Sequence, residues 1–249
     1  MIKNYFKTAW RNLWRNKVFS GINLLGLSIG LACCILMFLF IQHELSYDKF
    51  NVNANNIYRV YSIPTDSKDK KELAVTPAPW APLMKKDYPE IKEYVRLLRD
   101  EKMVIGQKGE QHFYEKDIFY ADSTFFNVFS VELERGDVKK ALDRPYSIVL
   151  TKEAAQKYFG NADPIGKTLE INSFVGVLDL EVTAIAKTMP ASSHFQFSSL
   201  ISFQTLGDMS NFWAYHMFQS YVLLNGKTSP KEIFFFFLPL PFLRLYLDL

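Results

Sequence analysis

The stretch that decides the architecture is residues 18–41, VFSGINLLGLSIGLACCILMFLFI, which contains no Asp, Glu, Lys, Arg or His. As an α-helix it would be about 36 Å long, enough to cross a hydrocarbon core of about 30 Å. In a soluble protein, a helix that is apolar on every side would have to be buried all round, which a chain of 249 residues seldom achieves. The run therefore predicts one transmembrane helix over residues 18–41.

Charge is distributed unevenly on the two sides of this run. Lys3, Lys7, Arg11, Arg15 and Lys17 precede it with no acidic residue, whereas the other 24 of the 29 basic residues stand against 26 acidic ones. Loops rich in Lys and Arg remain in the cytoplasm. We therefore expect a single pass through the cell inner (cytoplasmic) membrane, a cytoplasmic N-terminus and a periplasmic main domain.

Two kinds of cleaved leader are the alternatives. The apolar region of a signal peptide has about 7–15 residues and ends in small side chains, but residues 38–43 read FLFIQH. A lipoprotein signal would place a polar start after Cys33 and Cys34, yet seven more apolar residues follow.

Cys33 and Cys34 are the chain's only cysteines. Because they are adjacent, they cannot readily bridge each other, which excludes a disulfide framework. Two cysteines are also too few for a four-cysteine zinc site.

The segment before the membrane run has its own helical pattern. In residues 1–17, basic side chains recur every four positions, while Trp and other apolar side chains fill the opposite half of the helix. The pattern predicts an amphipathic helix on the cytoplasmic surface of the bilayer, with a solvated basic leader as the alternative. The expected interfacial anchors are Lys3, Lys7, Trp10, Arg11, Trp14 and Arg15.

Two glycines in the membrane run are candidates for helix packing. Gly26 and Gly30 form a small-xxx-small spacing, which lets a second helix approach closely. The spacing occurs by chance in many membrane helices, so it predicts a packing face only weakly.

Residues 42–232 alternate between strand-like and helix-like segments. A short helix is expected near Pro82 and must stop before Pro89, and another runs from the cap at Thr151 to Phe159 with Gly160 as its stop. Two hairpins are expected within residues 93–114. The expected strands are 57–63, 93–98, 103–105, 112–114, 147–150, 168–171, 180–186 and 221–224, the last being the final one.

These segments give an α+β fold class. The amphipathic helix and the single transmembrane helix are followed by a mixed-sheet α/β periplasmic domain. No internal repeat is evident in the sequence.

A phosphate-binding loop is the first chemical motif to test. Residues 160–168, GNADPIGKT, place five residues between the glycines where a Walker A loop has four. A helix is expected before the segment and a strand after it, the reverse of the arrangement that holds phosphate. The segment is interpreted as a structural turn, so we expect no ATP binding by this chain alone.

Other catalytic signals are weak. His43, His112, His194 and His216 are scattered without the spacing of a zinc protease, and no GxSxG motif occurs. Acidic pairs at 66 and 69 and at 132 and 134 are typical of a solvated face. We predict no enzyme activity, no metal and no cofactor. Nucleic-acid binding is not expected either, because the basic cluster flanks the membrane and the outer domain is slightly acidic.

Several short motifs, taken together in their order, resemble a known family. The N-terminal part resembles MacB-like ABC transporter permeases with an FtsX-like membrane unit, and the later part resembles their periplasmic core domain. The N-terminal motifs are RNL at 11–13, RNK at 15–17, ELSYDKF at 44–50 and IYRV at 57–60. The later ones are TPAP at 76–79, AD at 121–122, FF at 125–126, VLT at 149–151, YFG at 158–160, DPIGKT at 163–168 and SH at 193–194.

The resemblance implies a permease subunit of an efflux or export system. It implies a separate cytoplasmic ABC ATPase that drives dimerised membrane units, with the movement transmitted to the periplasmic domain to expel peptides, lipoproteins or other amphiphiles. The work would be mechanical rather than chemical. The implied partners are therefore the lipid bilayer, the ATPase subunit and a second permease unit.

The end of the chain departs from the family pattern. The family has at least three further membrane spans, and residues 233–249, IFFFFLPLPFLRLYLDL, contain two prolines and too short an apolar run to cross a bilayer. We interpret residues 233–249 as an atypical apolar tail from truncation or an altered frame. The expected divisions are 1–17 cytoplasmic helix, 18–41 transmembrane helix, 42–232 periplasmic core domain and 233–249 tail.

The main alternative comes from another functional class. A stand-alone membrane-anchored extracytoplasmic domain that binds or senses a ligand would have the same anchor and head. A neighbouring reading frame that encodes the missing spans, together with an ATPase gene, would favour the exporter subunit, whereas ligand binding without an ATPase would favour the sensor.

Overall fold

The computed structural model describes residues 2–62, 73–101, 103–190, 192–226 and 243–246, apart from the side chains of Ile2, Lys3, Phe6 and residues 243–246. The chain divides into two compact units, the anchor unit Met1–Tyr47 and the head Asp48–Leu249.

The anchor unit consists of two helices. α1 (Ile2–Arg15) is the helix expected from the four-residue basic repeat, and α2 (Lys17–Glu44) contains the whole uncharged run. Of the helices in the described part of the chain, α2 is the one long and apolar enough to cross a membrane. None of its residues is buried.

The head is built around a mixed sheet, so the expected α+β fold class is confirmed. The strands are β1 (Ile57–Ser62), β2 (Ile91–Asp100), β3 (Met103–Gly106), β4 (His112–Glu115), β5 (Ile118–Ala121), β6 (Leu133–Arg135), β7 (Ser147–Thr151), β8 (Thr168–Ser173), β9 (Gly176–Ala186), β10 (Ser199–Ser202), β11 (Gln219–Leu224) and β12 (Leu243–Tyr246). They lie in the order β12-β1-β11-β2-β5-β10-β7-β9-β8-β3-β4, with β6 beside β9. β10 is parallel to β5 and β7 to β9, and the other pairs are antiparallel.

Two expectations about the strands are wrong. β3 and β4 form a hairpin, but β2 does not pair with β3, because its neighbours in the sheet are β11 and β5. β11 is also not the final strand, because β12, inside the expected tail, pairs with β1. The remainder of 233–249 lies outside the described residues.

Among the described residues, three short helices pack on the sheet. Two 3-10 helices also occur there, η1 (Ala54–Asn56) and η2 (Phe203–Leu206). α3 (Trp80–Asp87) ends before Pro89, as expected, and α4 (Phe125–Val128) was not expected. α5 (Lys152–Phe159) has the predicted ends: the Thr151 hydroxyl accepts from the Ala154 amide at 3.3 Å. At the other end Gly160 has φ +58°, a backbone region that glycine enters without steric cost.

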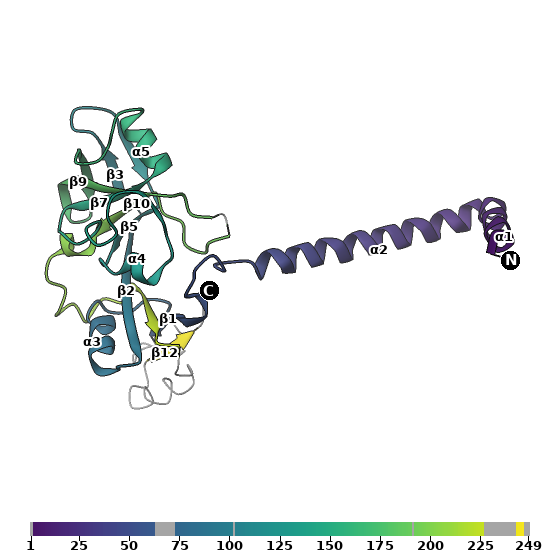
Figure 1. The fold of residues 1–249 in the computed structure, drawn as a ribbon, viewed down its shortest axis with the longest axis horizontal. Coiled ribbons are helices and arrows are strands. Elements are labelled where there is room, and N and C mark those ends of the chain that lie inside the picture. The colour runs from purple at the N-terminus through teal and green to yellow at the C-terminus, as the bar shows by residue number, and fades with distance from the viewer. Residues whose placement is uncertain (1, 63–72, 102, 191, 227–242, 247–249) are drawn as a thin grey trace. The chain divides into compact units, whose positions relative to one another are not determined.

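Alternating side chains distribute the core over both faces of the sheet. Ile118 and Tyr120 of β5 belong to the cluster that α5 covers, whereas Phe119 and Ala121 belong to the cluster on the other face, with α4. α3 covers a third cluster, over β1, β11 and β2. Figure 1 shows α3 and α5 near opposite ends of the head.

Candidate functional site

The glycine face of α2 is open. Methyl groups built on Gly26 and Gly30 would meet no atom within 4 Å, so a second helix has room to approach there. No described residue packs on that face, and its role in helix packing stays a prediction.

The predicted interfacial anchors lie on an exposed helix. In α1, the side chains of Lys7, Trp10, Arg11, Trp14 and Arg15 are exposed. The Lys17 ammonium lies 5.0 Å from the centre of the Trp14 ring. Lys3 lies in α1, but its side chain is outside the described residues, so the interfacial role of the whole set stays a prediction.

The head begins with a buried carboxylate. Asp48 is 2% exposed and has φ +53°, a region that Asp tolerates better than most residues. Its carboxylate accepts from His194 Nδ1 at 2.7 Å and from the His194 amide at 3.2 Å. The single proton of the Ser193 hydroxyl is shared between this carboxylate, at 3.1 Å, and the Phe195 carbonyl, at 2.9 Å. The Asp48 amide donates to the Ser192 carbonyl at 2.8 Å. We call Asp48, Ser193 and His194 the Asp48 cluster.

The Asp48 cluster joins the ELSYDKF motif at 44–50 to the SH motif at 193–194. Its members are 145 and 146 residues apart in the chain, and nothing local indicates that they meet. The signals available in the sequence were the ELSYDKF motif at 44–50 and the SH motif at 193–194.

A second attachment holds the same segment three residues on. The Asn51 side chain accepts from the Ser130 amide at 2.9 Å, and the Val52 amide donates to the Ser130 hydroxyl at 2.9 Å. Residues 48–52 are therefore hydrogen-bonded to two separate loops of the head.

Aromatic side chains lie directly behind the Asp48 cluster. Phe195 packs edge-on to Phe119 of β5 with ring centres 4.6 Å apart and is stacked on Phe129 at 6.2 Å. Phe197 lies 5.7 Å from Phe195 and is buried. The loop after Ser193 is thus fixed in the core of the sheet.

The same loop forms one wall of a polar cavity of about 320 Å³. Arg99 pairs with Asp117 at 2.8 Å, and His194 pairs with Asp48. Arg59 donates to the Ala74 carbonyl at 3.0 Å. The cavity is lined by Arg59, Arg99, Asp117, Phe119, His194, Phe195, Gln196, Gln219 and Tyr221.

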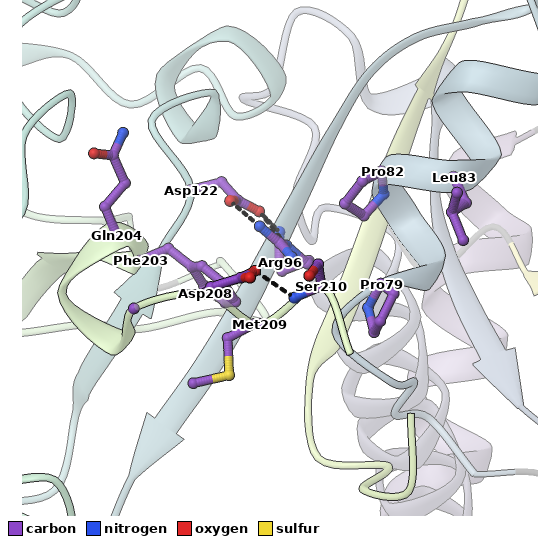
Figure 2. Close-up of a pocket in the computed structure, with 11 residues that line it drawn as sticks. Pro79, Pro82, Leu83, Arg96, Asp122, Phe203, Gln204, Asp208, Met209 and Ser210 are labelled. Atoms are coloured by element: carbon purple, nitrogen blue, oxygen red, sulfur yellow. Dashed lines mark hydrogen bonds and ion pairs between the residues drawn. The ribbon is translucent and has the colours of Figure 1, made fainter. Parts of the chain in front are cut away.

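Figure 2 shows a second cavity, of about 370 Å³, between α3 and the residues after η2. The Arg96 guanidinium forms a two-point ion pair with Asp122, with nitrogen–oxygen distances of 2.9 and 2.7 Å. It also donates to the Ala78 carbonyl at 2.9 Å and lies 3.9 Å from the centre of the Phe203 ring. These contacts connect β2 to three other segments, so we interpret the Arg96–Asp122 ion pair as structural.

A serine–histidine contact occurs elsewhere in the head. The Ser62 hydroxyl lies 2.8 Å from His216 Nδ1 and donates to the Val75 carbonyl at 2.6 Å. Because the hydroxyl proton is used in that bond, His216 donates to Ser62 and does not activate it as a nucleophile. Burial lowers the pKa of His216.

The other candidate motifs occupy structural positions. Residues 160–167 connect the end of α5 to β8, and the Gly166 amide donates to the Val182 carbonyl at 2.8 Å. Glu132 and Glu134 are exposed and pair with Lys187 and Lys152. Asp66 and Asp69 lie outside the described residues. In the part of the chain that the structure describes, no three His, Cys, Asp or Glu side chains are grouped to hold a metal ion.

Three solved structures share the fold of the head. A domain assigned to a permease protein of Porphyromonas gingivalis has a TM-score of 0.67 and 16% identity, over 79% of this chain and 92% of that one. The periplasmic region of MacB from Actinobacillus actinomycetemcomitans has a TM-score of 0.57 and 12% identity, over 78% and 89%. The extracellular domain of the ABC-type transporter YknZ from Gram-positive bacteria has a TM-score of 0.54 and 14% identity, over 77% and 100%.

None of the curated proteins matches the sequence. The family model described as MacB-like periplasmic core domain matches residues 20–234, which include most of α2 and nearly all the described head. The chain therefore belongs to the family of MacB-like periplasmic core domains, which are parts of ABC transporter permeases.

Proposed function

We propose that this chain is the membrane-anchored periplasmic part of an ABC-type export permease, and that it transmits ATPase-driven movement to substrate export. The observation that carries the proposal is the family match over residues 20–234. This continuous match includes most of the apolar helix together with the head. An isolated soluble domain would not need the helix.

The proposed orientation follows from charge. All five charged residues of the segment before α2's uncharged run are basic, which favours a cytoplasmic N-terminus and a head in the periplasm. We place the chain in the cell inner membrane, with the divisions 1–17, 18–41 and 42–232 given above. α1 would lie along the cytoplasmic lipid surface.

The proposed partners are the bilayer, a separate cytoplasmic ABC ATPase and a second permease unit. The open Gly26 and Gly30 face supports the contact with a second unit. A mechanical role agrees with the head's polar contacts, because Arg96, Asp122, Ser62 and Asp48 are used in bonds between segments.

Membrane topology tests the orientation. An alkaline phosphatase fused after residue 120 should be active, and a cytoplasmic reporter at the same position inactive. The matched control carries both reporters before residue 17 and should show the opposite pattern. Cytoplasmic activity after residue 120 would contradict the proposal.

An assay of ATP hydrolysis distinguishes the proposed exporter subunit from the alternative, an anchored sensor domain. The chain purified alone in detergent should not hydrolyse ATP, whereas native membranes solubilised mildly should yield the chain together with vanadate-sensitive ATPase activity. Removing residues 1–44 should abolish that association. A chain that is never accompanied by an ATPase and that binds a periplasmic ligand by itself would favour the sensor.

A further inference from the structure

We propose that the cavity between α3 and the residues after η2 binds a peptide segment in which a basic residue follows an apolar one. The apolar side chain would enter the cavity, and the basic group would lie beside the exposed carboxylate of Asp208. This binding site belongs to the head alone. It goes beyond the proposed function and requires neither an ATPase nor a contact with the anchor unit.

The cavity has apolar walls on two sides. Pro79, Pro82 and Leu83 line it from the start of α3, and Met209 lines it from the segment after η2, as Figure 2 shows. Its volume of about 370 Å³ lies within the range of about 300–1,000 Å³ that is typical of ligand sites. A cavity near the lower end of this range suits one large apolar side chain and the backbone around it.

Arg96 offers hydrogen bonds to a peptide backbone inside the cavity. Its Nε, Nη1 and Nη2 atoms each donate one bond, two to Asp122 and one to the Ala78 carbonyl. A guanidinium has more N–H groups than these bonds within the described part of the chain use. Because Arg96 lines the cavity, the others can donate to a peptide carbonyl. A simple alkylamine has no such acceptor, so this feature favours a peptide.

The charges around the cavity favour a cation. Arg96 and Asp122 neutralise each other, so Asp208 supplies the remaining charge among the described residues that line the cavity. The Ser210 amide donates to the Asp208 carboxylate at 2.9 Å, and this bond lowers the pKa of Asp208. The carboxylate is therefore ionised at neutral pH, where it attracts a basic side chain and repels an acidic one.

Exposed aromatic side chains extend the surface beyond the cavity. The chain leads from Met209 in the cavity wall to His216, whose ring lies 6.0 Å from the ring of Trp80 in α3. Between them, Trp213 is 45% exposed and Tyr215 is 57% exposed. Tyr and Trp are enriched where proteins bind other chains. A peptide can cover this border as well as the cavity, whereas a small amphiphile fills the cavity alone.

The experiment measures binding to the full chain in lipid nanodiscs with isotope-labelled methionine methyl groups. Met209 lines the cavity and reports binding there, whereas the buried Met103 of β3 reports that the head keeps its fold. The probe is the capped dipeptide acetyl-Leu-Lys-amide. Two matched probes, acetyl-Leu-Glu-amide and acetyl-Gly-Lys-amide, alter the charge and the apolar side chain separately.

The lysine probe should shift the Met209 methyl signal saturably and leave the Met103 signal unchanged. The glutamate probe should bind about fivefold more weakly, because Asp208 repels its charge. The glycine probe should bind about tenfold more weakly, because it buries no apolar side chain. The absence of a saturable shift at Met209 with the lysine probe would overturn the proposal.

Asp208→Asn tests the charge while keeping the size of the side chain. An asparagine oxygen can still accept from the Ser210 amide, and the variant should bind the lysine and glutamate probes equally. Asp179→Asn makes the same change in net charge at an exposed position of β9 that does not line the cavity, and it should keep the preference for lysine. A preference for lysine that survives Asp208→Asn would contradict the assigned role of Asp208.

Leu83→Ala tests the apolar wall. It should weaken binding of the lysine probe by about threefold, because the leucine side chain of the probe loses apolar contact. Val175→Ala is the matched control, since Val175 is 39% exposed, Leu83 is 38% exposed, and Val175 does not line the cavity. Equal effects of the two substitutions would place binding elsewhere on the head.

Isopentylamine distinguishes a peptide from a small amphiphile. It has the apolar group and a cation but no peptide carbonyl, so it should bind about tenfold more weakly than the lysine probe. Equal or tighter binding of the amine would overturn the assignment to a peptide. None of these measurements uses ATP, so failure of this site and failure of the export function are distinguishable.

Discussion

At the scale of single residues, polar side chains connect segments that the backbone leaves apart. Arg96 is the clearest case, since its guanidinium and its backbone amide both donate to the Asp122 carboxylate. The side chain of Arg96 is 11% exposed and that of Asp122 is 12% exposed. A charge in such a position is tolerated only while its partner remains. The pair therefore fixes how β2 meets the residues after β5.

Arg96→Met should lower the free energy of unfolding by about 3–5 kcal/mol, because it leaves Asp122 buried without its cation. Replacing Asp122 by asparagine in the same chain should recover part of that loss, because the uncompensated charge disappears. Urea unfolding of the two single variants and the double variant measures the coupling. If the losses in the free energy of unfolding of the two single variants simply added in the double variant, the ion pair would not contribute to stability.

At the scale of elements, we propose that the Gly26 and Gly30 face of α2 packs against another helix. Cys33 lies seven residues from Gly26, and Cys34 lies four from Gly30, so both cysteines share the glycine face. Both are exposed and free, which makes them natural reporters of a second copy.

Mild oxidation of native membranes should cross-link two chains through these cysteines. Gly26→Ile with Gly30→Ile should reduce the cross-linked fraction by about fivefold or more, because the added side chains prevent close approach. Ser28→Ile is the control, since residue 28 lies two positions from both glycines and faces the other side. Cross-linking that responds equally to all three substitutions would contradict the packing face.

At the scale of the whole molecule, the buried clusters formed by the described residues lie in the head. The three buried clusters contain residues of the head only, whereas α2 buries none of its side chains. Because each of these clusters is formed within the head, we expect the head's stability to depend little on the anchor unit.

Removal of residues 1–44 should change the free energy of unfolding of the head by less than about 0.5 kcal/mol. Urea unfolding of the full chain in detergent and of the shortened chain in the same detergent makes the comparison. A loss of several kcal/mol would mean that the anchor unit supports the head's core.

Sequence alone determined the features whose interactions are local. The uncharged run of α2, the basic spacing of α1 and the cap and stop of α5 at Thr151 and Gly160 could be located because helical bonds close within four residues. The order of short motifs also identified the family that the comparison confirmed.

Tertiary structure decided which distant segments meet. β5, β10 and α4 are four residues each, too short for a periodic signal, and β2 pairs with β11 and β5 rather than with its neighbour in sequence. The contact of Asp48 with His194 spans 146 residues. Pairing between strands and loops depends on the whole chain's packing, so no single segment of the sequence carries the information that specifies it.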